Sequence, residues 1–263
     1  MTTVTALGNE KGGVGKTSLA LGLASELQRQ GRSVLLVDLD PQCGVTKSIT
    51  HYDADASNIE HLLQEKPVVD VADVAQRTLW EGIYVIPGSR TLENIELDRD
   101  PFAFMRLREV LTDARVTEAF DDILIDTPPA IGTTKTLSAL YAAHRVLAVT
   151  SPEPMSIEGL DGFLQAVDKM RAKMRPDLRE AEIIVNDYDS RLTIHHAGIK
   201  TLRRAVDHMV LDPYVPSRAH VSFMTEQDGQ GKRLHDVGTQ SAMDAADALA
   251  RIVKHLIETA EEK

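Results

Sequence analysis

The stretch that decides the fold is residues 11–18, which read Lys-Gly-Gly-Val-Gly-Lys-Thr-Ser. It follows an apolar run from Val4 to Leu7 and precedes an apolar-periodic run that begins at Leu19. A strand, a glycine loop and a helix in that order are the context in which a loop binds phosphate. The sequence therefore predicts a site for the phosphates of a nucleotide.

Each residue type in this loop has a physical reason to be there. Glycines lack a Cβ, so their N–H groups can curl closely around an anion, and the start of the next helix adds unpaired N–H groups. Lys16 would place an ammonium on the β- and γ-phosphates, and Thr17 would offer its hydroxyl to Mg²⁺. The predicted phosphate-binding residues are Lys11, Gly12, Gly13, Val14, Gly15, Lys16, Thr17 and Ser18.

The loop departs from the usual pattern G-x-x-x-x-G-K-[ST] at its first position. Glu10 stands where the first glycine is expected, and a second cation, Lys11, opens the loop. Spacing leaves two options for Lys11: it folds onto its own nucleotide, or it reaches the nucleotide of a neighbouring subunit.

Acidic residues follow two predicted strands. Asp38 and Asp40 share one side of an extended chain because they are two residues apart, and Asp126 ends the apolar run 123–125. In parallel sheets, ligands bind at the carboxyl ends of strands. We expect Asp126 to hold Mg²⁺, through water because Mg²⁺ dehydrates reluctantly, with Asp40 as a possible second metal residue. For Asp38, the alternative to a role near the phosphates is that its side chain caps the end of the strand.

Apolar runs alternate with helical patterns along the whole chain. Short runs between turn signals predict strands, and continuous apolar strands predict a parallel sheet that is covered on both faces. We therefore expect one α/β domain over residues 1–263, with a mostly parallel twisted sheet and helices on both faces. The predicted strands are 34–38, 83–86, 123–126, 146–150, 182–186 and 210–215, and the predicted helices are 19–30, 57–64, 101–118, 133–143, 156–174, 197–208 and 239–260.

Composition excludes several classes of protein. A single cysteine, Cys43, rules out an internal disulfide and a four-cysteine metal cluster within one chain, and no apolar run reaches about 18 residues. The net charge of −11 is not the overall balance of a DNA-binding protein, so DNA contacts would need a local basic patch. Solvated helix faces are the alternative interpretation of its basic residues. The candidate DNA-binding residues are Lys200, Arg203, Arg204, Arg218, Lys232 and Arg233.

The loop, together with Asp38-Leu-Asp40 and Asp126-Thr-Pro-Pro, resembles the deviant Walker A ATPases of the ParA/MinD family, and ParA/Soj-type partition ATPases in particular. This resemblance implies a deviant P-loop NTPase that binds ATP and Mg²⁺. It also implies that Lys11 crosses a dimer interface to the partner's ATP, and that Lys11, Lys16 and Asp40 are catalytic. Asn186 would contact adenine, and Pro216 would pack near the base.

The resemblance further implies a DNA-partition ATPase. Its homodimer would form on ATP binding, coat non-specific nucleoid DNA in the cytoplasm and be released by a ParB-like centromere-binding partner that stimulates slow hydrolysis. A relative that positions a protein cargo and a P-loop metabolic enzyme of the dethiobiotin-synthetase kind are the alternatives. The acidic stretch 256–263 argues against membrane binding, and the strand at the start of the chain argues against an N-terminal helix-turn-helix domain.

Overall fold

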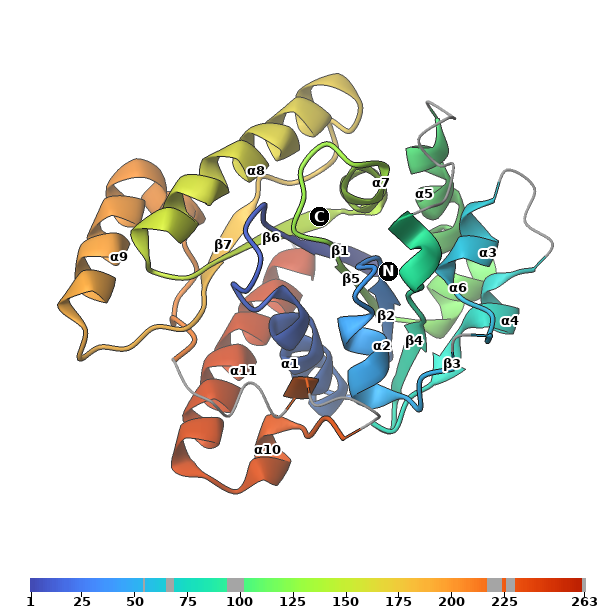
Figure 1. Cartoon of the computed structure of the whole chain (residues 1–263), viewed down its shortest axis with the longest axis horizontal. Coiled ribbons are helices and arrows are strands. Elements are labelled where there is room, and N and C mark those ends of the chain that lie inside the picture. Colours follow the sequence, from blue (N-terminus) through green and yellow to red (C-terminus); the bar gives the residue numbers. More distant parts are fainter. Residues whose placement is uncertain (54, 65–68, 94–101, 217–223, 226–229, 262–263) are drawn as a thin grey trace.

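The computed structural model describes residues 1–263 except 54, 65–68, 94–101, 217–223, 226–229 and 262–263. Its described strands form one sheet in the order β3-β4-β2-β5-β1-β6-β7, parallel throughout except for the β3–β4 pair (Figure 1). The strands are β1 (Thr3–Gly8), β2 (Val34–Asp38), β3 (Gln76–Arg77), β4 (Ile83–Ile86), β5 (Asp122–Asp126), β6 (Arg145–Thr150) and β7 (Glu182–Val185).

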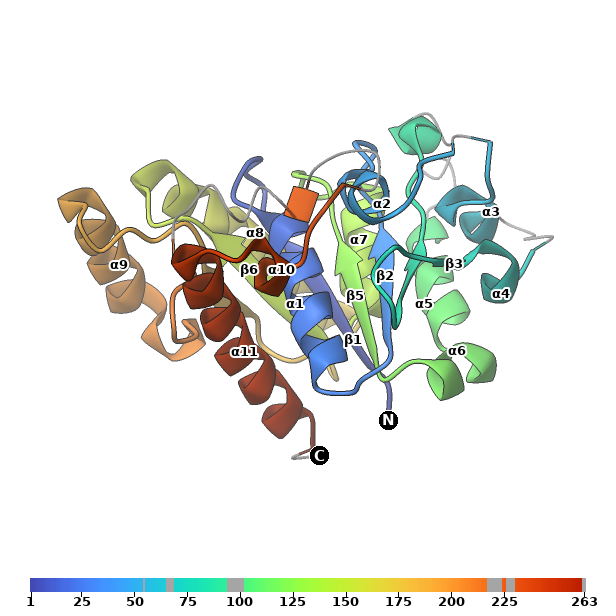
Figure 2. The same ribbon diagram turned by 90° about the horizontal axis from the view of Figure 1, so that it is seen from below.

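Helices cover both faces of this sheet. One face carries α1, α2, α10 and α11, which lie in front in Figure 2, and the other carries α3 to α8, with α9 beside the β7 edge. The helices are α1 (Lys16–Arg29), α2 (Gly44–Ile49), α3 (Ile59–Leu63), α4 (Val71–Val74), α5 (Arg106–Leu111), α6 (Ala114–Ala119), α7 (Thr134–Ala142), α8 (Pro154–Lys173), α9 (Thr193–Val206), α10 (Leu234–Val237) and α11 (Gln240–Glu261).

The central strands are apolar on both sides because each side faces its own core. Leu35 packs in the core under α3 to α8, whereas the next residue, Leu36, packs in the core under α1 and α11. Ile123 and Leu124 alternate between the same two cores. This arrangement explains the continuous apolar runs and confirms the predicted α/β fold with helices on both faces.

Two predicted elements were wrong. Residues 210–215 form no strand: Val210 and Pro216 make only isolated bridges to Ile183 and Tyr188, and Pro213 has no N–H to donate. The helix predicted over 101–118 is divided between α5 and α6. Asp113 starts α6 as its N-cap, since its side chain accepts the N–H of Arg115.

The region 51–78 contains α4 and β3, which the sequence did not predict, besides α3, which lies within the predicted helix 57–64. Trp80, in the turn between β3 and β4, is buried and donates its Nε1–H to the carbonyl of Gly231 at 3.0 Å. The guanidinium of Arg233 lies 5.7 Å from the centre of the Trp80 ring. These contacts fasten the segment before α10 to the β3–β4 turn.

Among the described residues, no helix is both long and apolar enough to cross a bilayer.

Candidate nucleotide site

The glycine loop leaves β1 and enters α1 with a backbone that requires glycine. Gly13 and Gly15 have φ angles of 78° and 91°, in the left-handed region. A Cβ on Gly15 would also lie 2.2 Å from Nδ2 of Asn186. Both conformation and space therefore exclude a side chain at Gly15.

The start of α1 is open to an anion. Its N-cap residue, Gly15, supplies no side-chain cap, and no acidic residue lies in its first turn. The first N–H groups of a helix have no partner within the helix and carry the positive end of its dipole. In the described structure this helix start is thus suited to bind phosphate.

Lys16 lies inside the loop with 6% of its surface exposed. Its Nζ donates to the main-chain carbonyl of Lys11 at 3.4 Å. Burial lowers the pKa of the Lys16 ammonium, and the nearby carboxylates of Asp126 and Asp40 oppose this shift. A bound phosphate would act in the same direction as these carboxylates and stabilise the charged lysine.

Thr17 and Asp126 meet at the ends of α1 and β5. The Thr17 hydroxyl donates to Oδ2 of Asp126 at 2.7 Å. Asp126 is fully buried, and its Oδ1 has no hydrogen-bond partner among the described residues. Burial, reinforced by the nearby carboxylate of Asp38, raises the pKa of Asp126 to about 8. A hydroxyl and a buried carboxylate oxygen without a partner are hard oxygen ligands, so these residues fit Mg²⁺, whose charge would offset the burial.

Asp38 and Asp40 have different surroundings. Asp38 is fully buried, and its Oδ2 accepts the N–H of Thr46 at 2.9 Å and the Thr46 hydroxyl at 2.7 Å. The same hydroxyl accepts the N–H of Gly88 at 2.9 Å. Asp38 therefore fastens β2 to α2 and, through Thr46, to the end of β4. Asp40 is half-exposed, and its Oδ1 accepts only the N–H of Gln42 among the described contacts.

Lys11 points toward α8. Its Nζ donates to Oγ of Ser156 at 2.9 Å and lies 3.8 Å from Oε2 of Glu153. Gly12 and Gly13 beside it are exposed. In this single chain the ammonium of Lys11 thus contacts the start of α8.

The two residues expected at the base lie together beyond β7. Asn186 is buried and donates its Nδ2–H to the carbonyl of Val14 at 2.9 Å, so it supports the loop directly. Pro216 bridges Tyr188, two residues after Asn186. The loop, Asn186 and Pro216 therefore lie at the same edge of the sheet.

Comparison with known proteins identifies the family. The AAA domain family model matches residues 2–180. The chain is 34% identical over 219 residues to the chromosome-partitioning ATPase Soj of Thermus thermophilus, with 82% of each protein covered. It is 31% identical over 223 residues to the chromosome partitioning protein ParA of Caulobacter vibrioides, covering 83% of this chain and 82% of that protein. The chain belongs to the ParA/Soj family of P-loop ATPases.

Solved structures with bound nucleotide share the fold of this chain. Cobyrinic acid a,c-diamide synthase from Mycobacterium smegmatis, with a bound ATP analogue and magnesium, superposes with a TM-score of 0.83 at 29% identity, covering 100% of this chain and 96% of that one. The McdA(D38A)–ATP complex from Cyanothece gives a TM-score of 0.83 at 19% identity, covering 98% of this chain and 96% of that one. The latter likeness shows the fold alone.

The predicted DNA-binding residues of this ParA/Soj-family chain differ in how far their side chains are engaged within the molecule. Arg203 is engaged by neighbours: it donates to the Tyr214 hydroxyl and pairs with Asp207 and Asp212. Arg233 likewise donates to Gln28 Oε1 and to the carbonyl of Glu81, besides stacking on Trp80. The exposed candidates are Lys200, Arg204 and Lys232, whereas Arg218 lies outside the described residues.

Sequence reasoning missed residues that support this ParA/Soj-type site. Asn9 is buried, donates to the carbonyl of Val149 at 2.6 Å and accepts the N–H of Lys11. Its position directly before the loop, at the end of an apolar strand, was the available signal. Thr46 and Ser156 carried no comparable signal, because their partners are Asp38 and Lys11, eight and 145 residues away.

Proposed function

We propose that this chain is an ATP-dependent DNA-partition ATPase whose ATP-bound and ADP-bound states differ in self-association and DNA binding. The observation that carries the proposal is the pairing of Thr17 with Asp126, whose free Oδ1 is buried next to Lys16 and the open start of α1. The ParA/Soj relatives named above support the assignment to partition.

ATP and Mg²⁺ are the cofactors. The loop N–H groups and Lys16 would bind the phosphates, and Thr17 and Asp126 would hold the metal, Asp126 through water. Bound Mg²⁺ would neutralise charge on the phosphate oxygens. Asp40, half-exposed beside Lys16, orients the attacking water. We expect intrinsic hydrolysis to be slow until a partner stimulates it.

A homodimer completes the site. Lys11 leaves Ser156 and Glu153 and reaches the ATP of the partner subunit, where its charge adds to that of Lys16. Asn186 and Pro216 contact the adenine from the β7 side. ATP is thus held by both subunits, and hydrolysis opens the dimer.

The dimer binds non-specific DNA through phosphate contacts. Among the predicted DNA-binding residues that the structure describes, Lys200 and Arg204 on α9 and Lys232 before α10 are exposed, and Arg218 lies outside the described residues. Two subunits double these charges, which must overcome repulsion from a chain of net charge −11. A ParB-like centromere-binding protein then stimulates hydrolysis and releases the dimer from the nucleoid in the cytoplasm.

Retention of the protein on DNA with ATP or ADP, across a salt series, tests this function. We expect retention with ATP only, with a logarithmic affinity that falls linearly with the logarithm of salt concentration. Retention without ATP, or none with ATP, would exclude the partition mechanism.

Positioning of a protein cargo is the second candidate. The observation that favours it is that Arg203 and Arg233, two of the predicted DNA contacts, are engaged inside the molecule. ATP-dependent dimerisation without DNA retention would select this function.

A further inference from the structure

The turn that follows β7 has a backbone conformation that neighbouring contacts must hold in place. Asp187, between Asn186 and Tyr188, has a φ of 61°, in the left-handed region. This region costs free energy for a residue with a Cβ, and such a residue stays there only where its surroundings hold it. The contacts of Tyr188 therefore fix the position of Asn186.

Tyr188 is held through its main chain and through its ring. Its N–H donates to the carbonyl of Val215 at 3.0 Å, and it bridges Pro216. Its ring packs edge to face on the ring of Tyr214, with centres 5.0 Å apart, and its hydroxyl lies 3.3 Å from Nδ1 of His196 on α9. Aromatic rings in this arrangement attract one another beyond the effect of their buried area. The turn after β7 is thereby joined to the segment that contains Tyr214 and to α9.

Arg203 fastens the same segment to α9. Each nitrogen of its guanidinium donates: Nε to the Tyr214 hydroxyl at 2.6 Å, Nη1 to Asp207 at 2.8 Å, and Nη2 to both carboxylate oxygens of Asp212 at 2.7 Å. The side chains of Asp207 and Asp212 are 69% and 68% exposed, and exposed ion pairs add little stability. The main effect of these contacts is therefore on geometry. The residues that we call the α9 clasp are Arg203, Tyr214, Tyr188 and His196.

We propose that the α9 clasp positions Asn186 and Pro216 for the nucleobase, with Arg203 as a positioning residue for nucleotide binding. In the proposed function, on which this assignment rests, Asn186 and Pro216 contact the adenine. Arg203 reaches them only through Tyr214 and Tyr188. The groups that bind phosphate have contacts of their own, such as the hydrogen bond between Thr17 and Asp126. Loss of Arg203 should therefore weaken binding of the adenosine part of a nucleotide and spare binding of the phosphates.

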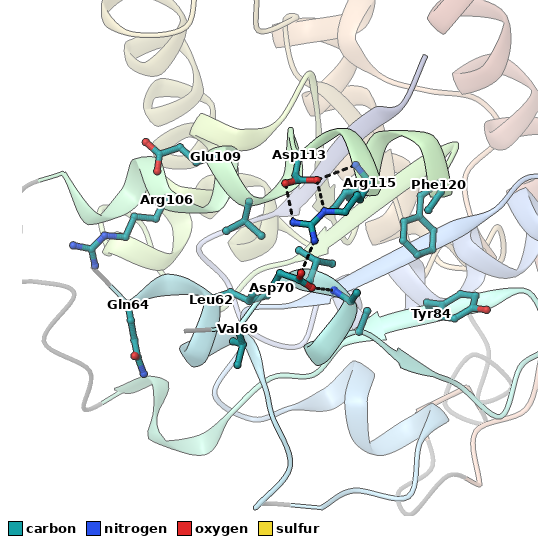
Figure 3. Close-up of a pocket in the computed structure, with 16 residues that line it drawn as sticks. Leu62, Gln64, Val69, Asp70, Tyr84, Arg106, Glu109, Asp113, Arg115 and Phe120 are labelled. Carbon is teal, nitrogen blue, oxygen red and sulfur yellow. Dashed lines mark hydrogen bonds and ion pairs between the residues drawn. The ribbon is translucent and has the colours of Figure 1, made fainter. Parts of the chain in front are cut away.

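Arg115 makes comparable ion pairs elsewhere in the chain. It pairs with Asp70, the N-cap of α4, and with Asp113, the N-cap of α6 (Figure 3). Figure 1 places α4 and α6 at the opposite end of the molecule from α9. Arg115→Gln therefore removes the same kind of exposed ion pair without reaching Asn186 or Pro216.

Thr201 offers a second control, on α9 itself. It is exposed, and its hydroxyl donates within the helix to the carbonyl of Ala197 at 3.0 Å. Thr201→Ala thus alters α9 two residues before Arg203 and leaves every contact of the α9 clasp in place.

The test compares ADP with pyrophosphate, each with Mg²⁺, by isothermal titration calorimetry on the full chain. Neither ligand has a third phosphate, so ATP hydrolysis and ATP-driven dimerisation do not enter. The ratio of the two dissociation constants measures what the adenosine part adds. For the unaltered chain we expect ADP to bind at least about ten-fold more tightly than pyrophosphate. For Arg203→Gln we expect this ratio to fall about two- to ten-fold, the range for one weakened hydrogen bond, with an unchanged affinity for pyrophosphate.

The two controls, Arg115→Gln and Thr201→Ala, should keep the ratio of the unaltered chain. An unchanged ratio in Arg203→Gln, or a loss of affinity that is equal for ADP and pyrophosphate, overturns the positioning role and leaves the adenine contacts standing. A ratio of about one in the unaltered chain overturns the adenine contacts of the proposed function, and the positioning role with them. The two failures are thus distinguishable.

NMR of the unaltered, ¹⁵N-labelled chain gives an independent readout. ADP should shift the Nε–H signal of Arg203 and the amide signals of Tyr188 and Tyr214, whereas saturating pyrophosphate should leave all of them in place. The Nε–H signal of Arg115 should respond to neither ligand. Equal shifts with the two ligands, or no shift of the Arg203 signal with ADP, would refute the proposal even if every variant folds poorly.

Discussion

The hydroxyl of Thr46 joins α2 to β2 through Asp38 and to the end of β4 through Gly88. Removal of this hydroxyl therefore tests the structure of the nucleotide edge. Thr46→Val keeps the shape of the side chain. It removes the 2.7 Å hydrogen bond to the buried Asp38 carboxylate and the acceptor of the Gly88 N–H. A hydrogen bond to a charged group contributes about 1.5–3 kcal/mol, and a buried N–H without an acceptor costs about 1–3 kcal/mol. Because the N–H of Thr46 still donates to Asp38, we expect a loss of about 3 kcal/mol in the free energy of unfolding.

Urea denaturation of the nucleotide-free chain measures this loss, and thermal unfolding should show a midpoint lowered by roughly 6–12 °C. Thr50→Val is the matched control in the same helix region. The Thr50 hydroxyl donates only to the carbonyl of Thr46, which also accepts the Thr50 N–H, so its removal leaves no buried group unpaired. We expect a loss below about 1 kcal/mol for this control. Equal losses in the two variants would refute the reasoning.

Three further predictions concern the proposed function. Asp126→Asn removes a metal carboxylate, so Mg²⁺-dependent ATP hydrolysis should fall at least about 100-fold while nucleotide-free stability is kept, as turnover and urea curves together will show. Lys11→Ala should retain binding of a fluorescent ATP analogue but lose partner-stimulated turnover; undiminished stimulation would contradict the action of Lys11 across the dimer. Lys200→Ala combined with Arg204→Ala should reduce the salt slope of DNA binding by about one per lost phosphate contact, and an unchanged slope would place the DNA patch elsewhere.

The central strands and the glycine loop could be predicted because short, contiguous stretches of sequence determine them. β2 and β5, which end at Asp38 and Asp126, are buried on both faces, and this burial appears in the sequence as an uninterrupted apolar run. The loop 11–18 combines glycines, lysine and hydroxyls within eight residues. Nothing distant in the chain is needed to interpret either signal.

Features that depend on distant partners could not be predicted in this way. Arg203 has the spacing of a free helix face with Lys200 and Arg204, but Asp212 and Tyr214 approach it from the chain beyond α9. Arg233 is held by Gln28, Trp80 and the Glu81 carbonyl, all more than 150 residues earlier. Periodicity describes which side of a helix a residue occupies, and it contains no information on what packs against that side.

Trp80 gives this molecule a spectroscopic property of its own. It is the single tryptophan of the chain, and its indole is held between the Gly231 carbonyl and the Arg233 guanidinium. Indole emission depends on the polarity and charge around the ring, so the intrinsic fluorescence of the protein comes from this one junction. Detachment of the segment before α10 would change the emission maximum, and the event can be followed in real time without a dye.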